Sequence, residues 1–319
     1  MPLNPKVEQM LEMIARAQRP PYSTLTPQQA RLAYEKSAPI LEIASAPMFS
    51  VDDLALPMRD GELIRARLYQ PFEPSWTAPA PALVYYHGGG FTIGSVDTHD
   101  ALCRMFAREA HCAVLSVDYR LAPEHRFPTA VEDAFDALRW LHDTAASYGI
   151  DSARIALGGD SAGGTLATVC AVLAREAGMA PVLQLLLYPG TTGHQQSASQ
   201  AQFAEGFLLS RDTIQWFFEH YVRDAEDRDD WRFAPLDGMR GAPDFSGVAP
   251  AWIAIAEYDP LRDEGAAYAR KLRAAGNAVT LECYAGMVHE FFKLGGFIPE
   301  VAAAHAAAAA ALRAAFGIV

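Results

Sequence analysis

Apolar residues along this chain follow two spacings, one typical of strands and one typical of helices. Short apolar runs at residues 82–86, 113–117, 154–160, 182–188, 251–256 and 279–284 predict buried strands. Apolar residues three and four positions apart at 130–146, 162–177, 264–275 and 299–316 predict helices. Strands that alternate with helices form a mainly parallel sheet covered by helices on both faces. We therefore expect one α/β domain over residues 1–319.

The first part of the chain does not follow this alternation. Residues 4–18 have helical spacing, and Thr26-Pro27-Gln28-Gln29 is a capping-box signature that opens a second helix. Residues 51–57 and 62–69 then alternate in polarity on either side of Asp60-Gly61, which predicts a β-hairpin. Two helices ahead of any strand indicate an appendage on the α/β core.

A second departure is the insertion of about sixty residues between Gly190 and Pro250. It contains one clear helix, near residues 212–221, and several aromatic side chains, among them Phe203 and Phe217. An irregular segment of this length inside a compact domain is more often a functional lid than a connection.

Composition and charge narrow the class of protein. The chain has 319 residues, of which 51% are hydrophobic and 20% charged, as in a soluble globular domain. A formal net charge of −12 opposes binding to nucleic acid, which depends on Lys and Arg at the phosphates. The N-terminus lacks the apolar core of a signal peptide, and residues 301–315 are too short and too weakly apolar to cross a bilayer. We expect a cytoplasmic protein without nucleic-acid partner or membrane insertion.

The four cysteines carry no metal or redox signature. Cys103, Cys112, Cys170 and Cys283 form no C-x-x-C pair, so neither a zinc site nor a redox dithiol is indicated. We expect four buried thiols and no metal.

The first chemical motif is Gly159-Asp160-Ser161-Ala162-Gly163, placed between the strand at 154–160 and the helix that follows it. It has the G-x-S-x-G pattern of a nucleophile elbow, a sharp turn that exposes a serine hydroxyl at the edge of a sheet. Small neighbours leave room for the strained turn and for a substrate carbonyl. A glycine-rich turn with an ordinary surface serine is the alternative, because the pattern also occurs by chance.

The second motif decides between these alternatives. His87-Gly88-Gly89-Gly90-Phe91 follows the strand at 82–86 directly. Three glycines could form a flexible turn, but they also leave backbone N–H groups free to point at a ligand oxygen. Lipases and esterases with the G-x-S-x-G elbow use such a loop as an oxyanion hole. Both motifs in this order favour catalysis by Ser161.

An acid and a histidine complete the set. Asp259 follows the strand at 251–256, and His289 follows the last strand. The order Ser161, Asp259, His289 is that of α/β-hydrolases, and residues beyond the carboxyl ends of parallel strands can meet at one point. Ser161 would attack an acyl carbon, His289 would carry its proton, and the acid would orient His289. On spacing alone, Glu257 and Asp263 compete with Asp259 for the third role.

These motifs resemble the bacterial branch of the hormone-sensitive lipase family of carboxylesterases, in its Gly-Asp-Ser-Ala-Gly subgroup. The resemblance is carried by residues 87–91, 118–125, 159–164 and 259–264 together with His289. It implies the α/β-hydrolase fold with a helical cap built from residues 1–50 and about 190–245. It also implies Asp259 as the triad acid, and an oxyanion hole from N–H groups of Gly88, Gly89 or Gly90 with that of Ala162. Without the resemblance, the charged loop at 118–125 is predicted to be a structural turn fixed by ion pairs.

The resulting hypothesis is a serine carboxylesterase that hydrolyses short- to medium-chain, uncharged acyl esters without a cofactor. An amidase or arylformamidase-like hydrolase would use the same residues, and a small-molecule receptor on the same scaffold is a further alternative. Either a monomer or a homodimer is compatible with the sequence. An apolar stripe on the first helix, Val7, Met10, Leu11 and Ile14, is expected to pack on the insertion and complete the cap.

Overall fold

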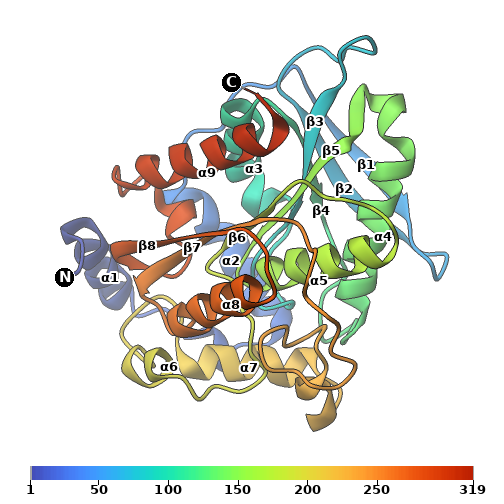
Figure 1. Ribbon diagram of the computed structural model, residues 1–319. Coiled ribbons are helices and arrows are strands. Elements are labelled where there is room, and N and C mark those ends of the chain that lie inside the picture. Colours follow the sequence, from blue (N-terminus) through green and yellow to red (C-terminus); the bar gives the residue numbers. More distant parts are fainter. Residues whose placement is uncertain (1, 319) are drawn as a thin grey trace.

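The computed structural model describes residues 2–318, whose strands form one eight-stranded sheet (Figure 1). The strands are β1 (Ser50–Pro57), β2 (Leu63–Gln70), β3 (Ala80–Tyr86), β4 (Ala113–Val117), β5 (Ile150–Asp160), β6 (Gln184–Leu187), β7 (Ala251–Tyr258) and β8 (Val279–Val288). Their order is β1-β2-β4-β3-β5-β6-β7-β8. The hairpin β1–β2 and the pair β2–β4 are antiparallel, and all other pairs are parallel. The predicted mainly parallel α/β architecture is confirmed.

Helices cover both faces of this sheet, as the alternating sequence pattern predicts. The helices are α1 (Pro5–Ala17), α2 (Pro27–Leu41), α3 (Asp100–Ala110), α4 (Thr129–Thr144), α5 (Ala162–Glu176), α6 (Ala198–Gln202), α7 (Arg211–Tyr221), α8 (Arg262–Ala274) and α9 (Val301–Phe316). Buried side chains of α4, α5 and α8 share one core cluster, and those of α3 and α9 share the other, on the opposite face (Figure 1). The two cores fix the sheet, and with it the loops at its carboxyl edge.

One core helix is absent from the sequence prediction. Helix α3 has Leu102, Met105 and Phe106 buried at helical spacing. Four core strands, β3, β5, β7 and β8, are also longer than their apolar runs. In particular, β8 continues to Val288, so His289 follows its last residue directly.

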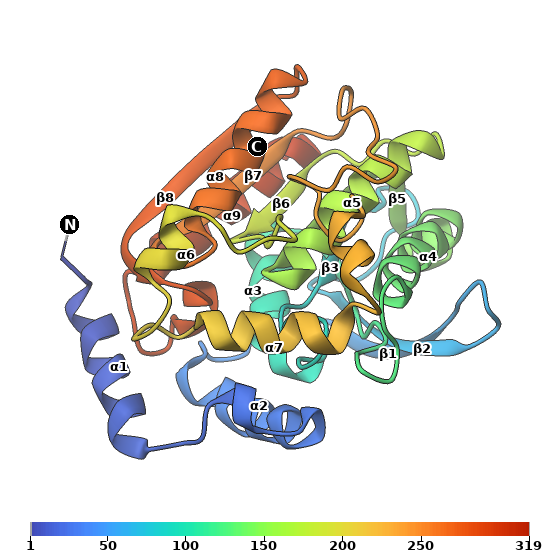
Figure 2. The same cartoon turned by 90° about the horizontal axis from the view of Figure 1, so that it is seen from below.

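The N-terminal helices and the insertion lie beyond the main sheet-and-helix layers (Figure 2). Ala30 and Tyr34 of α2 share a buried cluster with Ile214, Trp216 and Phe217 of α7. Helix α2 and the insertion therefore pack against each other over the carboxyl edge of the sheet.

Helix α1 packs in a different cluster from the one that holds the buried residues of α2. Val7 and Met10 are buried in the core cluster that contains Met287 and Phe291, and Phe207 and Leu208 of the insertion pack against the same cluster. Ile14, at the end of the stripe, is 42% exposed. The first residues of the stripe thus pack at the β8 end of the sheet. The Asn4 N–H, just before α1, also donates to the Gly286 carbonyl of β8 at 3.1 Å.

Two further findings concern the expectations from composition. Within residues 2–318, no helix has the length and apolar character needed to cross a membrane. Cys103, Cys112 and Cys170 are buried, but Cys283 is exposed, so the expectation of four buried thiols is wrong. Cys283 lies on β8 at the edge of the sheet, where alternate side chains face outward.

Candidate active site

The Ser161 turn has the strained geometry expected of a nucleophile elbow. Ser161 directly follows β5 and caps α5 with φ 53° and ψ −118°, a conformation that costs free energy for a residue with a side chain. A Cβ on Gly163 would lie 1.9 Å from the Tyr86 carbonyl oxygen, so this position excludes any larger residue. The Ser161 N–H donates to the Leu187 carbonyl at 2.9 Å and ties the turn to β6.

Three side chains from three loops form one hydrogen-bonded line. His289 Nε2 lies 2.9 Å from Ser161 Oγ, and His289 Nδ1 lies 2.7 Å from Asp259 Oδ2. Asp259 is fully buried and His289 is 4% exposed. The other Asp259 oxygen accepts from the Leu261 N–H at 2.8 Å, which fixes the carboxylate plane. A partly buried serine with a buried imidazole and carboxylate in this geometry can transfer a proton from the hydroxyl to the ring.

The competing acids are engaged elsewhere. Asp263 accepts from the Ser199 N–H at 2.8 Å and from the Arg262 guanidinium at 2.9 Å. Glu257 accepts from the Gly286 N–H at 2.8 Å. The carboxylate that contacts His289 is therefore that of Asp259, in agreement with the position the family resemblance implies.

The environment of His289 favours its protonated form. Burial lowers the pKa of His289, but the Asp259 carboxylate and its hydrogen bond raise that pKa by more, so it lies above the ordinary value. The imidazole is thus a stronger proton acceptor than a histidine in water.

The glycine loop after β3 contains one backbone N–H that is already hydrogen-bonded to a described residue and two that are not. The Gly88 N–H donates to Asp160 Oδ1 at 2.9 Å and is therefore not available for a substrate oxygen, which corrects its inclusion among the oxyanion donors. In the part of the chain that the structure describes, no hydrogen bond engages the N–H of Gly89, Gly90 or Ala162. Unused N–H groups beside a reactive hydroxyl are the donors that an oxyanion hole needs.

Asp160 and the loop at 118–125 support this arrangement, and sequence reasoning missed the role of Asp160. The fully buried Asp160 carboxylate also accepts from Tyr85 Oη at 2.8 Å and lies 3.3 Å from His99 Nε2. Burial raises the pKa of Asp160, but His99, Lys293 and the hydrogen bond from Tyr85 together lower it by more, so the group stays ionised. One carboxylate thus holds the elbow and the glycine loop together.

His87 of the glycine loop is a packing residue. Its ring stacks on Tyr119 with centroids 4.3 Å apart, and Tyr119 Oη donates to the His87 carbonyl at 2.8 Å. Burial lowers the pKa of His87 to about 3, so the ring is neutral. Arg120, next to Tyr119, pairs with Asp60 at 2.7 Å and Asp133 at 2.6 Å, which confirms the structural turn fixed by ion pairs.

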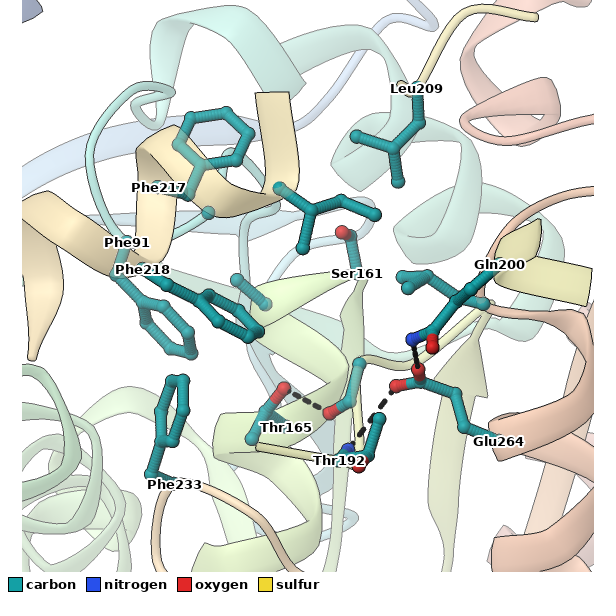
Figure 3. A pocket seen from close by; sticks show the side chains of 15 residues that line it. Phe91, Ser161, Thr165, Thr192, Gln200, Leu209, Phe217, Phe218, Phe233 and Glu264 are labelled. Atoms are coloured by element: carbon teal, nitrogen blue, oxygen red, sulfur yellow. Dashed lines mark hydrogen bonds between the residues drawn. The ribbon is translucent and has the colours of Figure 1, made fainter. Parts of the chain in front are cut away.

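An apolar cavity of about 50 Å³ opens at Ser161, between α5 and α7 (Figure 3). Its lining is mostly aliphatic and aromatic and includes Phe91, Leu209, Ile214, Phe217, Phe218, Phe233 and Leu261. Glu264 is the one carboxyl group in the lining and accepts from the Thr191 N–H and the Gln200 amide. Burial raises the pKa of Glu264 to about 8, so the wall is largely uncharged near neutral pH. Such a cavity suits an uncharged organic group.

Comparison with known proteins places the chain in a family. Residues 83–293 match the sequence profile of the family described as the alpha/beta hydrolase fold. The chain belongs to the α/β-hydrolase family. The "Carboxylic ester hydrolase LipN" of Mycobacterium tuberculosis is 49% identical over 269 residues, covering 81% of this chain and 69% of that protein. The "Ethyl acetate hydrolase" of Pseudomonas putida is 40% identical over 306 residues, covering 94% of this chain and 95% of that protein.

Solved structures agree with these relatives. An ester hydrolase from the metagenome of Lake Arreo, determined with a bipyridine phosphonate derivative, superposes on this α/β-hydrolase with a TM-score of 0.92. The two chains are 41% identical, and the match covers 99% of each. The resemblance to the bacterial hormone-sensitive lipase family is confirmed, and the protein is a carboxylic ester hydrolase.

Proposed function

We propose that this α/β-hydrolase cleaves short- to medium-chain acyl esters with Ser161 as nucleophile, His289 as proton carrier and Asp259 as orienting acid. The observation that carries the proposal is the line of hydrogen bonds from Asp259 through His289 to Ser161. His289 Nε2 takes the Ser161 proton as Oγ attacks the ester carbon, and then gives it to the leaving alcohol. Water then attacks the acyl-enzyme. His289 takes a proton from this water and gives it to Ser161 Oγ as the acid is released.

The negative oxygen formed at each addition would be bound by N–H groups of Gly89, Gly90 and Ala162. Their hydrogen-bonding capacity is unused, and Ala162 is the first residue of α5, where the helix dipole favours negative charge. Loss of one such donor in a serine hydrolase costs about 10²- to 10³-fold in kcat.

The acyl group would occupy the apolar cavity beside Ser161. A volume of about 50 Å³ favours small acyl groups, since one ordered water needs roughly 10–15 Å³ on the same measure. We assign the roof of this cavity to a cap formed by residues 1–50 and about 190–245. Support comes from the shared α2–α7 cluster and from the cavity residues that α7 supplies, Ile214, Phe217 and Phe218.

The test is a series of 4-nitrophenyl esters from acetate to laurate, assayed with wild-type protein and after treatment with a phosphonate that labels active-site serines. We expect the highest kcat/KM at acetate to butyrate, complete loss of activity on labelling, and the adduct on Ser161 by peptide mass spectrometry. An adduct on another residue, or labelled protein that remains active, would contradict the assignment.

A further inference from the structure

We propose that Tyr34, Glu290 and Lys293 are positioning residues that hold the His289 turn against helix α2. The proposal rests on the role assigned to His289 above. It adds a function for α2 that is separate from covering the acyl cavity.

The turn that carries His289 has an unfavourable backbone. Glu290 follows His289 immediately and has φ 63° and ψ 9°, in the left-handed region that side chains disfavour. The Lys293 N–H donates to the Glu290 carbonyl at 2.9 Å and closes the turn. A strained conformation next to a functional residue persists only where surrounding contacts hold it.

The contacts that hold this turn come from α2. Tyr34 Oη donates to Glu290 Oε1 at 2.8 Å and accepts from Lys293 Nζ at 2.7 Å. Lys293 Nζ also lies 4.5 Å from the centre of the Tyr34 ring and 3.4 Å from Glu42 Oε1. The side chain of Tyr34 is 5% exposed and that of Lys293 is also 5% exposed. Hydrogen bonds in such a buried chain are stronger than those exposed to water.

Helix α2 can serve as a fixed support because it is anchored at another point as well. The Arg31 guanidinium donates to the carbonyls of Thr92 at 2.9 Å and Ala122 at 2.7 Å, and pairs with Glu124 at 2.6 Å. Thr92 lies two residues after Gly90 of the glycine loop. One helix therefore contacts the segment after the glycine loop through Arg31 and, about one helical turn later, the histidine turn through Tyr34.

The chain of bonds runs from α2 through Glu290 to the residue that accepts the serine proton. A rotation of Glu290 would move His289 relative to both Ser161 Oγ and Asp259, which it contacts at 2.9 and 2.7 Å. Displacement of a reacting group by about 1 Å can cost on the order of 100-fold in rate. A loss of the Tyr34 hydroxyl should therefore lower kcat while leaving substrate binding nearly unchanged.

The main experiment compares Tyr34→Phe with Tyr22→Phe in the full-length protein. Tyr22 packs edge-on to Tyr34, with ring centroids 6.4 Å apart, and in residues 2–318 it makes no hydrogen bond to the histidine turn. With 4-nitrophenyl butyrate we expect Tyr34→Phe to lose about 10- to 100-fold in kcat with KM within about twofold of wild type. Tyr22→Phe should match wild type. The low-field proton resonance of His289 Nδ1–H, which reports its bond to Asp259, should shift or broaden only in Tyr34→Phe.

A second pair of variants changes Glu290, the acceptor of the hydrogen bond from Tyr34. Glu290→Gln keeps an oxygen that accepts from Tyr34 Oη and should retain most of the wild-type kcat. Glu290→Ala removes it and should resemble Tyr34→Phe, and the double variant should be no worse than either single one because both remove the same interaction. Melting temperatures of all variants show whether each is folded.

Two results would overturn the proposal, and they are distinct. A Tyr34→Phe protein that melts earlier but keeps wild-type kcat and the wild-type proton resonance would show a contact that only stabilises the fold. Ser161→Ala, run alongside, must be inactive. If it is active, the assignment of the catalytic residues is wrong and the positioning role falls with it.

Discussion

The loops at the carboxyl edge of the sheet and the proposed cap above them depend on different kinds of sequence signal. Ser161, Asp259 and His289 each follow the last residue of a strand, β5, β7 and β8 respectively. Their meeting point follows from strand order and from short local motifs. The proposed cap depends on which distant segments pack together, and there the buried residues of α1 and α2, which are neighbours in sequence, lie in different clusters. The positions of the proposed catalytic residues thus follow from local patterns, whereas the shape of the proposed substrate site depends on long-range contacts.

The largest effect should come from the edge of the sheet. Ser161→Ala removes the nucleophile and leaves only oxyanion binding, so kcat should fall by about 10⁴- to 10⁶-fold with an unchanged melting temperature. Steady-state assays with 4-nitrophenyl butyrate measure this. A variant with more than about a tenth of wild-type activity would mean that the Ser161 motif has been misinterpreted.

The next largest loss of kcat is expected from substitution of the proposed orienting acid, Asp259. Asp259→Asn should lower kcat by roughly 10⁴-fold, because an amide favours the wrong tautomer of His289. Asp263→Asn and Glu257→Gln are matched controls on the same loop and should cost far less. If either control proves as harmful while Asp259→Asn is mild, the acid has been misassigned.

The dependence of kcat/KM on pH tests the charge environment of His289. Because Asp259 raises the pKa of His289, and only neutral imidazole accepts the serine proton, kcat/KM should fall tenfold per pH unit below an apparent pKa above about 6.5. In Asp259→Asn the residual activity should persist to lower pH. An apparent pKa below 6.5 in wild type, or no shift in the variant, would contradict the stated balance of burial and charge.

A smaller effect should come from the cap side of the cavity. Phe218 lies on α7 and lines the cavity together with Phe91 and Phe233 (Figure 3). Phe218→Ala should make room for longer acyl chains and raise the octanoate-to-acetate ratio of kcat/KM by about fourfold per added methylene accommodated, from about 0.8 kcal/mol each. Phe72→Ala, at a half-exposed phenylalanine outside the cavity lining, is the control. Equal octanoate-to-acetate ratios in both variants would show that α7 does not line the acyl site.

The smallest effect on catalysis is expected for α1. Deletion of residues 2–19 removes the buried Val7 and Met10, each worth about 1.5–3 kcal/mol when fully buried, so thermal stability should fall by several degrees. Because Val7 and Met10 lie in the cluster at the β8 end of the sheet, and not in the cluster with the cavity residues Leu209, Ile214 and Phe217, relative activity on acetate, butyrate and octanoate should stay within about twofold. A selective loss of activity on octanoate would indicate that α1 is part of the cap.

Sequence reasoning found most of the fold and the members of the candidate site because their signals are local. Strand-turn motifs identified Ser161 and the glycine loop, and the capping box at Thr26 marks the start of α2 in the structure as in the prediction. Helix α3 had an equally local signal, the spacing of Leu102, Met105 and Phe106, and could have been predicted.

Other features depend on contacts that no local pattern contains. Tyr34 and Lys293 are separated by 259 positions, and each alone resembles an ordinary helix or surface residue. The use of the Gly88 N–H by Asp160 depends on how β3 and β5 lie side by side. The core residues around the α1 stripe, Met287 and Phe291, could not be inferred either, since an apolar stripe indicates that a partner exists but not which one.

The Asp160 carboxylate has a consequence for how this sequence can diverge. The G-x-S-x-G pattern leaves its second position open, yet here that position serves Tyr85, the Gly88 N–H and His99 at once. A neutral apolar replacement would leave three buried polar groups without their acceptor. Change at position 160 should therefore be tolerated only together with compensating change at 85 and 99, and the three positions should covary among descendants of this chain.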